Sequence, residues 1–256
     1  MSNVELLVLT RDQPRHIFFA DKLTESFRSS KVIIEKSPSP TNLGKDLKEF
    51  QVVEKSFFPD SHKLQGNLDE RIAKVIENGE INEPEVINFM TNMDPYFLAV
   101  FGTSILKNPL IESFPHHRIL NFHAGLSPYY RGVVSNLWAI HNEEPEYIGV
   151  TIHYLDTGID TGNIIVQGRP ILEEADTTHT IGCKCVTLGT DLMISTIKKY
   201  KREGSLISTI QDHTKGHLYK KRDFTEKVSE EIKMKIEGGV IQKYLDNPKE
   251  VDIITW

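Results

Sequence analysis

Asn121 and His123 are the residues whose types and spacing best suit chemistry at a carbonyl group. They lie two positions apart in the run ILNFHAGLSPYYRG, residues 119–132, so a strand through this run would place both side chains on one face. A histidine exchanges protons near neutral pH, and an asparagine amide can donate a hydrogen bond to a developing oxyanion. The pair favours acyl transfer, although a single histidine in a strand is more often structural than catalytic.

A turn-rich loop, residues 124–132, follows this pair. Its glycines and proline bend and restrict the backbone, and Tyr129, Tyr130 and Arg131 lie between them. Loops carried by a rigid sheet commonly deliver substrate contacts, so these three residues are candidate substrate contacts. The alternative is a simple surface turn with a solvated Arg131.

Two Asp-Thr-Gly triplets, beginning at Asp156 and Asp160, mark a second motif at residues 149–167. An aspartic-protease dyad brings its aspartates together from separate structural units, so two triplets in one loop argue against that class. One aspartate is expected to form the turn, and the other to be functional. A carboxylate at Asp160 can orient His123 and stabilise its charged form, but the sequence does not place the two in contact.

The composition narrows the function classes further. None of the 16 glycines falls into a dinucleotide-binding or P-loop pattern, and a net charge of -6 argues against a nucleic-acid partner. Cys183 and Cys185 are the only cysteines, so we expect reduced thiols and no metal site. Without a basic leader or a long apolar run, the chain is expected to be cytoplasmic, with no membrane partner.

The elements that must position the polar residues follow from the hydrophobic pattern. Short apolar runs predict strands, and apolar residues three and four apart predict helices. Strands are expected at residues 4–9, 32–34, 96–101, 118–122, 147–154 and 163–167, and helices at residues 15–27, 67–79, 135–140, 177–200 and 229–244. The alternation of strands and helices favours an α/β fold with a mostly parallel sheet.

The expected helix at residues 67–79 rests on local signals. Asn67 and Glu70 could form a capping box, and Gly79 is a plausible stop. Its proposed buried face consists of apolar residues at helical spacing: Leu68, Ile72, Val75 and Ile76.

The motifs together resemble those of the folate-dependent formyltransferases. N-x-H, then L-S-P-x-Y-R-G, then G-V-T-I-H and G-I-D-T-G occur in that order. This family includes glycinamide ribonucleotide formyltransferase, methionyl-tRNA formyltransferase and the sugar N-formyltransferases. The resemblance is close over residues 96–182, weaker before them and slight after residue 205. It implies a Rossmann-like mostly parallel sheet with flanking helices, the formyltransferase fold, as a catalytic domain at residues 1–205, with a small C-terminal subdomain at residues 206–256.

The resemblance also implies a site and a cofactor. The family's catalytic set corresponds to Asn121, His123 and Asp160, and its formyl donor is 10-formyltetrahydrofolate. The folate would be held largely by backbone of two loops, at Gly102, Thr103, Ser104, Ile105 and Leu106 and at Leu155 and Asp156. Where many members have Ser-Leu-Leu-Pro after the histidine, this chain has Ala124 followed by Gly-Leu-Ser-Pro, a variant similar to the nucleotide-sugar branch.

For the acceptor, the resemblance favours the amine of a nucleotide-linked amino deoxysugar, of GDP- or dTDP-4-amino-4,6-dideoxyhexose type, used in surface polysaccharide synthesis. Arg131 or the cluster at residues 220–222, including Lys221, would contact the diphosphate, and Tyr219 or Trp138 would stack near the base or sugar. A homodimer is a further expectation by analogy.

Several alternatives remain open. The tRNA enzyme carries an additional C-terminal nucleic-acid-binding domain, for which about fifty residues leave little room, and the glycinamide ribonucleotide enzyme is a shorter chain. A formyltetrahydrofolate hydrolase would use the same three residues with water as the acceptor, but usually has an extra N-terminal domain. A non-catalytic folate-binding module would need a damaged catalytic set, and Asn121, His123 and Asp160 are all intact.

Overall fold

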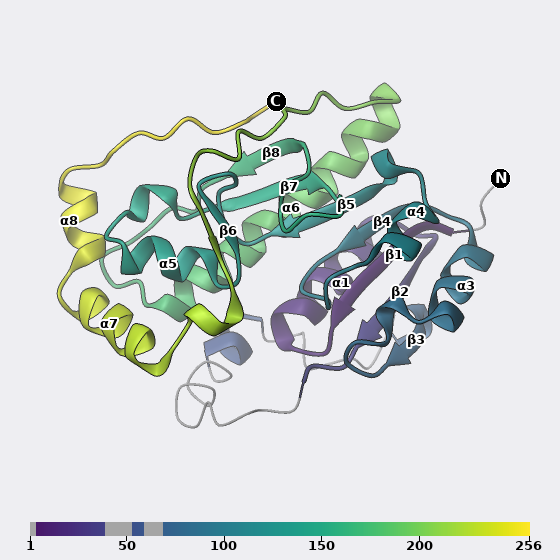
Figure 1. Cartoon of the computed structure of the whole chain (residues 1–256), viewed down its shortest axis with the longest axis horizontal. Helices are drawn as coiled ribbons and strands as arrows, with labels where there is room; N and C mark the ends of the chain where they lie inside the picture. Colours follow the sequence, from purple (N-terminus) through teal and green to yellow (C-terminus); the bar gives the residue numbers. More distant parts are fainter. Residues whose placement is uncertain (1–3, 39–52, 59–68) are drawn as a thin grey trace. The chain divides into compact units, whose positions relative to one another are not determined.

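The computed structural model describes residues 4–38, 53–58 and 69–256 (Figure 1). It divides into two compact units, Met1–Phe122 and His123–Trp256. The functional division predicted at residue 205 stays a prediction.

The first unit contains a parallel sheet with the strand order β3-β2-β1-β4-β5. The strands are β1 (Val4–Arg11), β2 (Ser30–Glu35), β3 (Ile72–Ile76), β4 (Pro95–Val100) and β5 (Ile119–His123). In the register, Leu9 lies opposite Ile33 of β2 and Val100 of β4. The predicted strands at residues 4–9, 32–34, 96–101 and 118–122 are therefore confirmed to within a few residues.

The apolar runs form central strands because both faces of this sheet are covered. Leu7 of β1 and Leu98 of β4 are completely buried. Helix α1 (Pro14–Ser26) begins with a proline at its first turn, where the missing N–H costs nothing. Its apolar side, including Phe19 and Leu23, packs on β1 and β2.

The helix predicted at residues 67–79 is wrong over the part that the structure describes. Asp69–Arg71 form one turn of 3-10 helix, and Ile72–Ile76 form strand β3. In this short run the apolar residues fit strand pairing as well as helical spacing, and β-branched side chains favour the strand. Parallel pairing of Val75 with Ile34 of β2 decides the outcome. Asn67 and Leu68 lie outside the described residues.

Four short elements complete the described part of the first unit beyond β3. These are η3 (Glu80–Asn82), α3 (Pro84–Met93), α4 (Asn108–Glu112) and η4 (His116–Arg118). Gly79, predicted as a helix stop, has a positive φ of 92° and precedes η3. The last two elements lead the chain from β4 into β5.

The second unit is built around an antiparallel hairpin and one long helix. Its elements are β6 (Tyr130–Gly132), α5 (Ser135–His141), η5 (Pro145–Tyr147), β7 (Val150–Tyr154), β8 (Ile164–Gly168), α6 (Thr178–Glu203), β9 (His217–Tyr219), η6 (Lys221–Asp223), α7 (Glu226–Glu237) and α8 (Val240–Asp246). Strands β7 and β8 pair with Thr151 opposite Gln167, and α6 packs on both. Thr177 caps α6 through a reciprocal bond with Thr180, which satisfies two free N–H groups of its first turn.

Two expectations about side chains and helices have clear outcomes here. Cys183 and Cys185 on α6 are buried free thiols, as predicted.

The single helical stretch expected at residues 229–244 is two helices, α7 and α8. Gly238 and Gly239 separate them, and Gly239 has a φ of 75°, a left-handed conformation that glycine adopts without strain.

Residues 205–256 are tied to the hairpin by backbone hydrogen bonds. Thr209 pairs with Ile164 through bonds of 2.7 and 2.8 Å, and Ile254 accepts a bond of 2.7 Å from Gln167. Figure 1 shows the end of the chain, in yellow, returning from α8 to β8. Strand β9 pairs in parallel with β6, placing Leu218 opposite Arg131. In the described part of the chain, no helix is long and apolar enough to cross a membrane.

Candidate active site

His123, the last residue of β5, is held between a carboxylate and a carbonyl oxygen. Its Nδ1 lies 3.2 Å from Oδ2 of Asp160, and its Nε2 lies 2.9 Å from the carbonyl oxygen of Tyr130. Both neighbours can only accept hydrogen bonds when Asp160 is ionised. The ring therefore satisfies both contacts when both nitrogens carry hydrogen, which is its cationic form.

Asp160 lies in the loop between β7 and β8 and faces one backbone N–H and two imidazoles. Its Oδ2 accepts a 2.8 Å bond from the N–H of Gly132 as well as facing His123, and its Oδ1 lies 3.7 Å from Nε2 of His153. Burial by itself would raise the pKa of Asp160, but His123, His153 and the Gly132 N–H together lower it well below its usual range. Asp160 is thus a carboxylate that stays ionised at neutral pH.

The backbone of Asp160 is in an uncommon conformation. Its φ is 52°, in the left-handed region that non-glycine residues enter at a cost of about 1–3 kcal/mol. Aspartate tolerates this region better than most residues. The surrounding contacts must hold the loop in place.

His153 is a member of this cluster that the sequence reasoning did not assign. It lies on β7, is 2% exposed, and its Nδ1 donates a 2.8 Å bond to the carbonyl oxygen of Tyr154. That bond leaves Nε2 directed to Asp160. The available signal was a second histidine at the end of a predicted strand, just before the loop that carries Asp160.

Asn121 precedes His123 by two residues on β5 and lies opposite Val100 of β4. Its side chain is partly exposed. Strand alternation places its side chain on the same face as that of His123, as predicted from the N-x-H spacing.

Two glycines allow the close approaches around this cluster. A Cβ on Gly125 would lie 2.5 Å from Nε2 of His123. Gly132 has a φ of 92°, and a Cβ there would lie 2.1 Å from the carbonyl oxygen of Tyr219. Larger residues at either position would displace His123 or the N–H that binds Asp160.

The predicted substrate-binding tyrosines are in different environments. Tyr130 is 1% exposed, and its hydroxyl donates to Glu144 and accepts a 2.9 Å bond from Asn142. Burial and the Glu144 contact raise its pKa. Tyr219 stacks on Trp138 with ring centroids 4.2 Å apart, so one face of Tyr219 is already covered. Tyr129, which is partly exposed, packs on Tyr147.

Arg131 is the buried cation of this region. It is 8% exposed, and one Nη lies 3.5 Å from Nδ1 of His213. Among the residues that the structure describes, its Nε has no hydrogen-bond partner. Lys221, the other predicted phosphate contact, is an exposed residue of η6.

The first predicted folate loop, residues 102–106, belongs to the first unit. Side chains from outside the loop form hydrogen bonds with its backbone. The N–H of Ser104 donates a 2.6 Å bond to Glu35, and the carbonyl oxygen of Ile105 accepts a 3.0 Å bond from Asn82. Gly102 is exposed, as is the Ile105 side chain at 66%. The loop therefore exposes backbone and one apolar side chain, and hydrogen bonds to Glu35 and Asn82 fix its conformation.

The second predicted folate loop includes Leu155 and Asp156. Oδ1 of Asp156 accepts bonds from the N–H of Gly158 at 3.1 Å and from the hydroxyl of Thr161 at 2.7 Å. These contacts are those of a turn-forming aspartate. The two aspartates of the repeated triplet thus have different surroundings, as expected.

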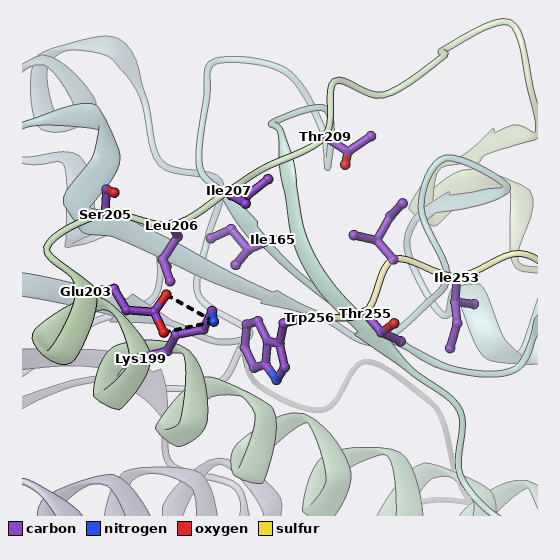
Figure 2. A pocket seen from close by; sticks show the side chains of 11 residues that line it. Ile165, Lys199, Glu203, Ser205, Leu206, Ile207, Thr209, Ile253, Thr255 and Trp256 are labelled. Atoms are coloured by element: carbon purple, nitrogen blue, oxygen red, sulfur yellow. Dashed lines mark hydrogen bonds and ion pairs between the residues drawn. The ribbon is translucent and has the colours of Figure 1, made fainter.

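A separate cavity of about 760 Å³ lies beside β8 (Figure 2). Ile165, Trp256 and the ion pair of Lys199 with Glu203 contribute to its lining. None of the predicted site residues lines it.

Comparison with known proteins agrees with this architecture. Residues 25–197 match a family model described as formyl transferase. A curated relative, methionyl-tRNA formyltransferase of Caldanaerobacter subterraneus subsp. tengcongensis, is 34% identical over 136 residues, which are 53% of this chain and 43% of that protein. The chain thus spans less than half the length of that relative.

Two solved structures share the fold. A 4-N formyltransferase from Francisella tularensis matches with a TM-score of 0.62 and 16% identity, over 92% of this chain and 88% of that chain. An N-formyltransferase from Helicobacter canadensis, in complex with folinic acid and dTDP-3-aminofucose, matches with a TM-score of 0.57 and 20% identity, over 87% of this chain and 72% of that chain. The predicted α/β fold, with a mostly parallel sheet, flanking helices and C-terminal helices, is confirmed.

Proposed function

Because this chain belongs to the formyl transferase family, we propose that it transfers the formyl group of 10-formyltetrahydrofolate to an amine. The observation that carries the proposal is the position of His123 between Asp160 and the Tyr130 carbonyl oxygen. This arrangement orients the imidazole two residues from Asn121 on the same strand. An imidazole and an amide N–H are groups that can stabilise the oxyanion of acyl transfer.

In the proposed mechanism, the amide of Asn121 donates a hydrogen bond to the negative charge that develops on the formyl oxygen. His123 donates a second hydrogen bond to that oxygen through Nε2–H. Asp160 orients the ring through Nδ1. The proton lost by the attacking amine leaves through a water held by the same groups, and the folate nitrogen is protonated as its bond to the formyl carbon breaks.

The chain's own residues suit a folate, which supplies an activated formyl group. Residues 102–106 offer exposed backbone at Gly102 and the exposed side chain of Ile105, which an apolar ring system could cover. Glu35 and Asn82 fix this backbone. We propose that this loop contributes backbone contacts to the folate. The folate contact expected of Leu155 and Asp156 stays a prediction.

The proposed acceptor is a nucleotide-linked amino deoxysugar. Arg131 supports this choice because a guanidinium can bind a phosphate through two parallel hydrogen bonds. Partly exposed Tyr129 and exposed Lys221 are the further substrate contacts that we propose. The dTDP-3-aminofucose in the Helicobacter canadensis structure makes dTDP-linked amino sugars the first candidates to test.

A second candidate acceptor is methionyl-tRNA. It is favoured by the 34% identity to the Caldanaerobacter enzyme, whereas the net charge of -6 argues against an extended polyanion. The same catalytic residues would act on either amine.

One assay separates these proposals. The protein is incubated with 10-formyltetrahydrofolate and, in parallel, dTDP- and GDP-linked amino sugars, glycinamide ribonucleotide, methionyl-tRNA or no amine, and products are identified by mass spectrometry. Formylated nucleotide sugar is expected. Formylation of tRNA alone would replace the acceptor, and formate release without any amine would indicate a hydrolase.

The phosphate contact has its own test. Arg131→Ala should weaken binding of dTDP or GDP at least about tenfold, because a charge-assisted pair contributes more than 1.4 kcal/mol. Arg202→Ala is the matched control, since Arg202 has a 70% exposed side chain paired with Glu203. Equal nucleotide affinity in both variants would remove Arg131 from the site.

A further inference from the structure

A side chain from residues 206–256 reaches the loop that carries Asp160. Gln211 lies between α6 and β9, is 5% exposed, and donates through its amide nitrogen to two carbonyl oxygens. The acceptors are Asp160, at 2.9 Å, and Gly162, at 2.6 Å. Both belong to the loop between β7 and β8 (Figure 1).

The orientation of the Gln211 amide follows from these neighbours. Two backbone carbonyl oxygens can only accept, so the NH2 group must face them. The other end, Oε1, is buried and has no partner among the described residues. An acceptor left unpaired in this way is unfavourable, so the two donated bonds are what this side chain contributes.

The backbone on either side of Gln211 is also fixed. Thr209 forms a two-bond bridge with Ile164 of β8, which anchors the segment two residues before Gln211. The Gln211 amide is therefore fixed in position where it bonds to the loop. Asp160 in this loop has a φ of 52°. Holding the carbonyl of Asp160 also determines where its side chain leaves the backbone.

From these contacts we infer that Gln211 is a positioning residue for the Asp160 carboxylate. It holds the loop so that Oδ2 meets His123 and the Gly132 N–H while Oδ1 faces His153. This inference rests on the proposed function, and it assigns residues 206–256 a part in the chemistry of the site. Gln211 itself does not touch the reacting groups.

The test replaces the two donors and follows both activity and the hydrogen bond of His123. Gln211→Met keeps the length of the side chain without any N–H, and Gln211→Asn keeps both donors on a shorter chain. Gln242→Met is the matched control, because the side-chain amide of Gln242 on α8 donates a 2.6 Å bond to Asp246 of the same helix. Formyl transfer is measured as kcat and KM across pH, with thermal unfolding as a check on folding.

The second readout does not depend on activity. The ring N–H proton of His123 that faces Asp160 is detected by NMR and assigned by its loss in Asp160→Asn. We expect Gln211→Met to lower kcat about 10- to 100-fold with little change in KM and to shift or broaden this signal. Gln211→Asn should retain part of both, and Gln242→Met should match the wild type.

The possible outcomes separate this inference from the proposed function. If Gln211→Met, or Gln211→Asn where the former does not fold, keeps the wild-type kcat and the wild-type ring N–H signal, the inference is overturned. If the wild-type protein transfers no formyl group to any amine, the proposed function fails. In that case the NMR signal alone decides whether Gln211 positions Asp160.

Discussion

Glu35 and Asp160 are both carboxylates held by several donors, but their donors differ in kind. Glu35 is completely buried and accepts from the N–H groups of Gly79, at 2.7 Å, and Ser104, at 2.6 Å. Arg11 adds a guanidinium at 3.5 Å. Asp160 also accepts from a backbone N–H, but its other two partners are the imidazoles of His123 and His153.

The comparison shows how a carboxylate with a structural role differs from one that can act in a reaction. Backbone N–H groups and a guanidinium keep their protons throughout the physiological range, so Glu35 can only fasten its neighbours together. An imidazole gains and loses a proton near neutral pH, so the carboxylate at Asp160 controls groups that can take part in a reaction. Burial and full hydrogen bonding alone do not identify an active site.

Asp160→Asn should have the largest effect. The substitution removes the negative charge that orients His123, and kcat should fall by about 10³- to 10⁴-fold, as expected when the acid behind a catalytic imidazole is lost. Steady-state formyl transfer measures this directly. Glu35→Gln is the counterpart in the first unit. Glutamine has one acceptor oxygen, so one of the N–H groups of Gly79 and Ser104 loses its acceptor; this cost should fall on stability, and kcat should stay within about threefold of the wild type. An equal decrease in kcat in both variants would contradict the proposed difference between the two carboxylates.

His153→Ala should change activity less than Asp160→Asn does. It removes one of the two imidazoles that face Asp160 and leaves the carboxylate free to shift, so kcat should fall about 10- to 100-fold. His141→Ala is the control, because His141 pairs with Glu231, 2.9 Å away, on α7. If the two variants had the same kcat, His153 would have only a packing role.

Glu35→Ala should act mainly on stability and folate binding. Two buried N–H groups would lose their acceptor, which costs about 1–3 kcal/mol for each unsatisfied group, and the loop containing Ser104 would lose its support. Urea unfolding measures the first effect, and the KM for the folate measures the second. Glu25→Ala removes an exposed carboxylate paired with Lys22 and should change neither. A Glu35→Ala protein as stable as Glu25→Ala would contradict the structural role.

The smallest expected effect is a pH dependence of stability. The pKa of Asp160 is lowered in the folded protein, so its ionised form stabilises the fold at pH above the unfolded value of about 3.9. This contribution is lost as pH falls from there toward the lower folded pKa. The difference in unfolding free energy between wild type and Asp160→Asn should therefore shrink between pH 5 and pH 3. A constant difference across that range would show that the ionised form of Asp160 does not stabilise the fold.

Much of the scaffold was predictable, for reasons visible in individual strands. Residues 6–9 of β1 and 97–100 of β4 are apolar throughout because both faces of the strands are covered, and the spacing of Asn121 and His123 directly gives a shared face. The helix predicted over Ile72–Ile76 is wrong because the apolar residues fit both helical and strand spacing, and pairing with β2 selects the strand. Local patterns cannot contain that information.

The contacts of the site were harder to predict because they join distant positions. Asp160 reaches His123 through the loop between β7 and β8, and its backbone is held by Gln211 from beyond α6. His153 lay in a recognised motif, but only the geometry shows that its Nε2 faces Asp160. No periodicity in the sequence marks such contacts.

The central claim is that Asn121, His123 and Asp160 transfer a formyl group from folate to an amine. Its most direct test is the rate of formyl transfer to the best acceptor by wild type, Asn121→Ala and His123→Ala, with folding verified by thermal unfolding. Each substitution should lower kcat about 10²- to 10³-fold by removing a group that stabilises the oxyanion. A folded His123→Ala or Asn121→Ala protein that transfers formyl at the wild-type rate would contradict the account.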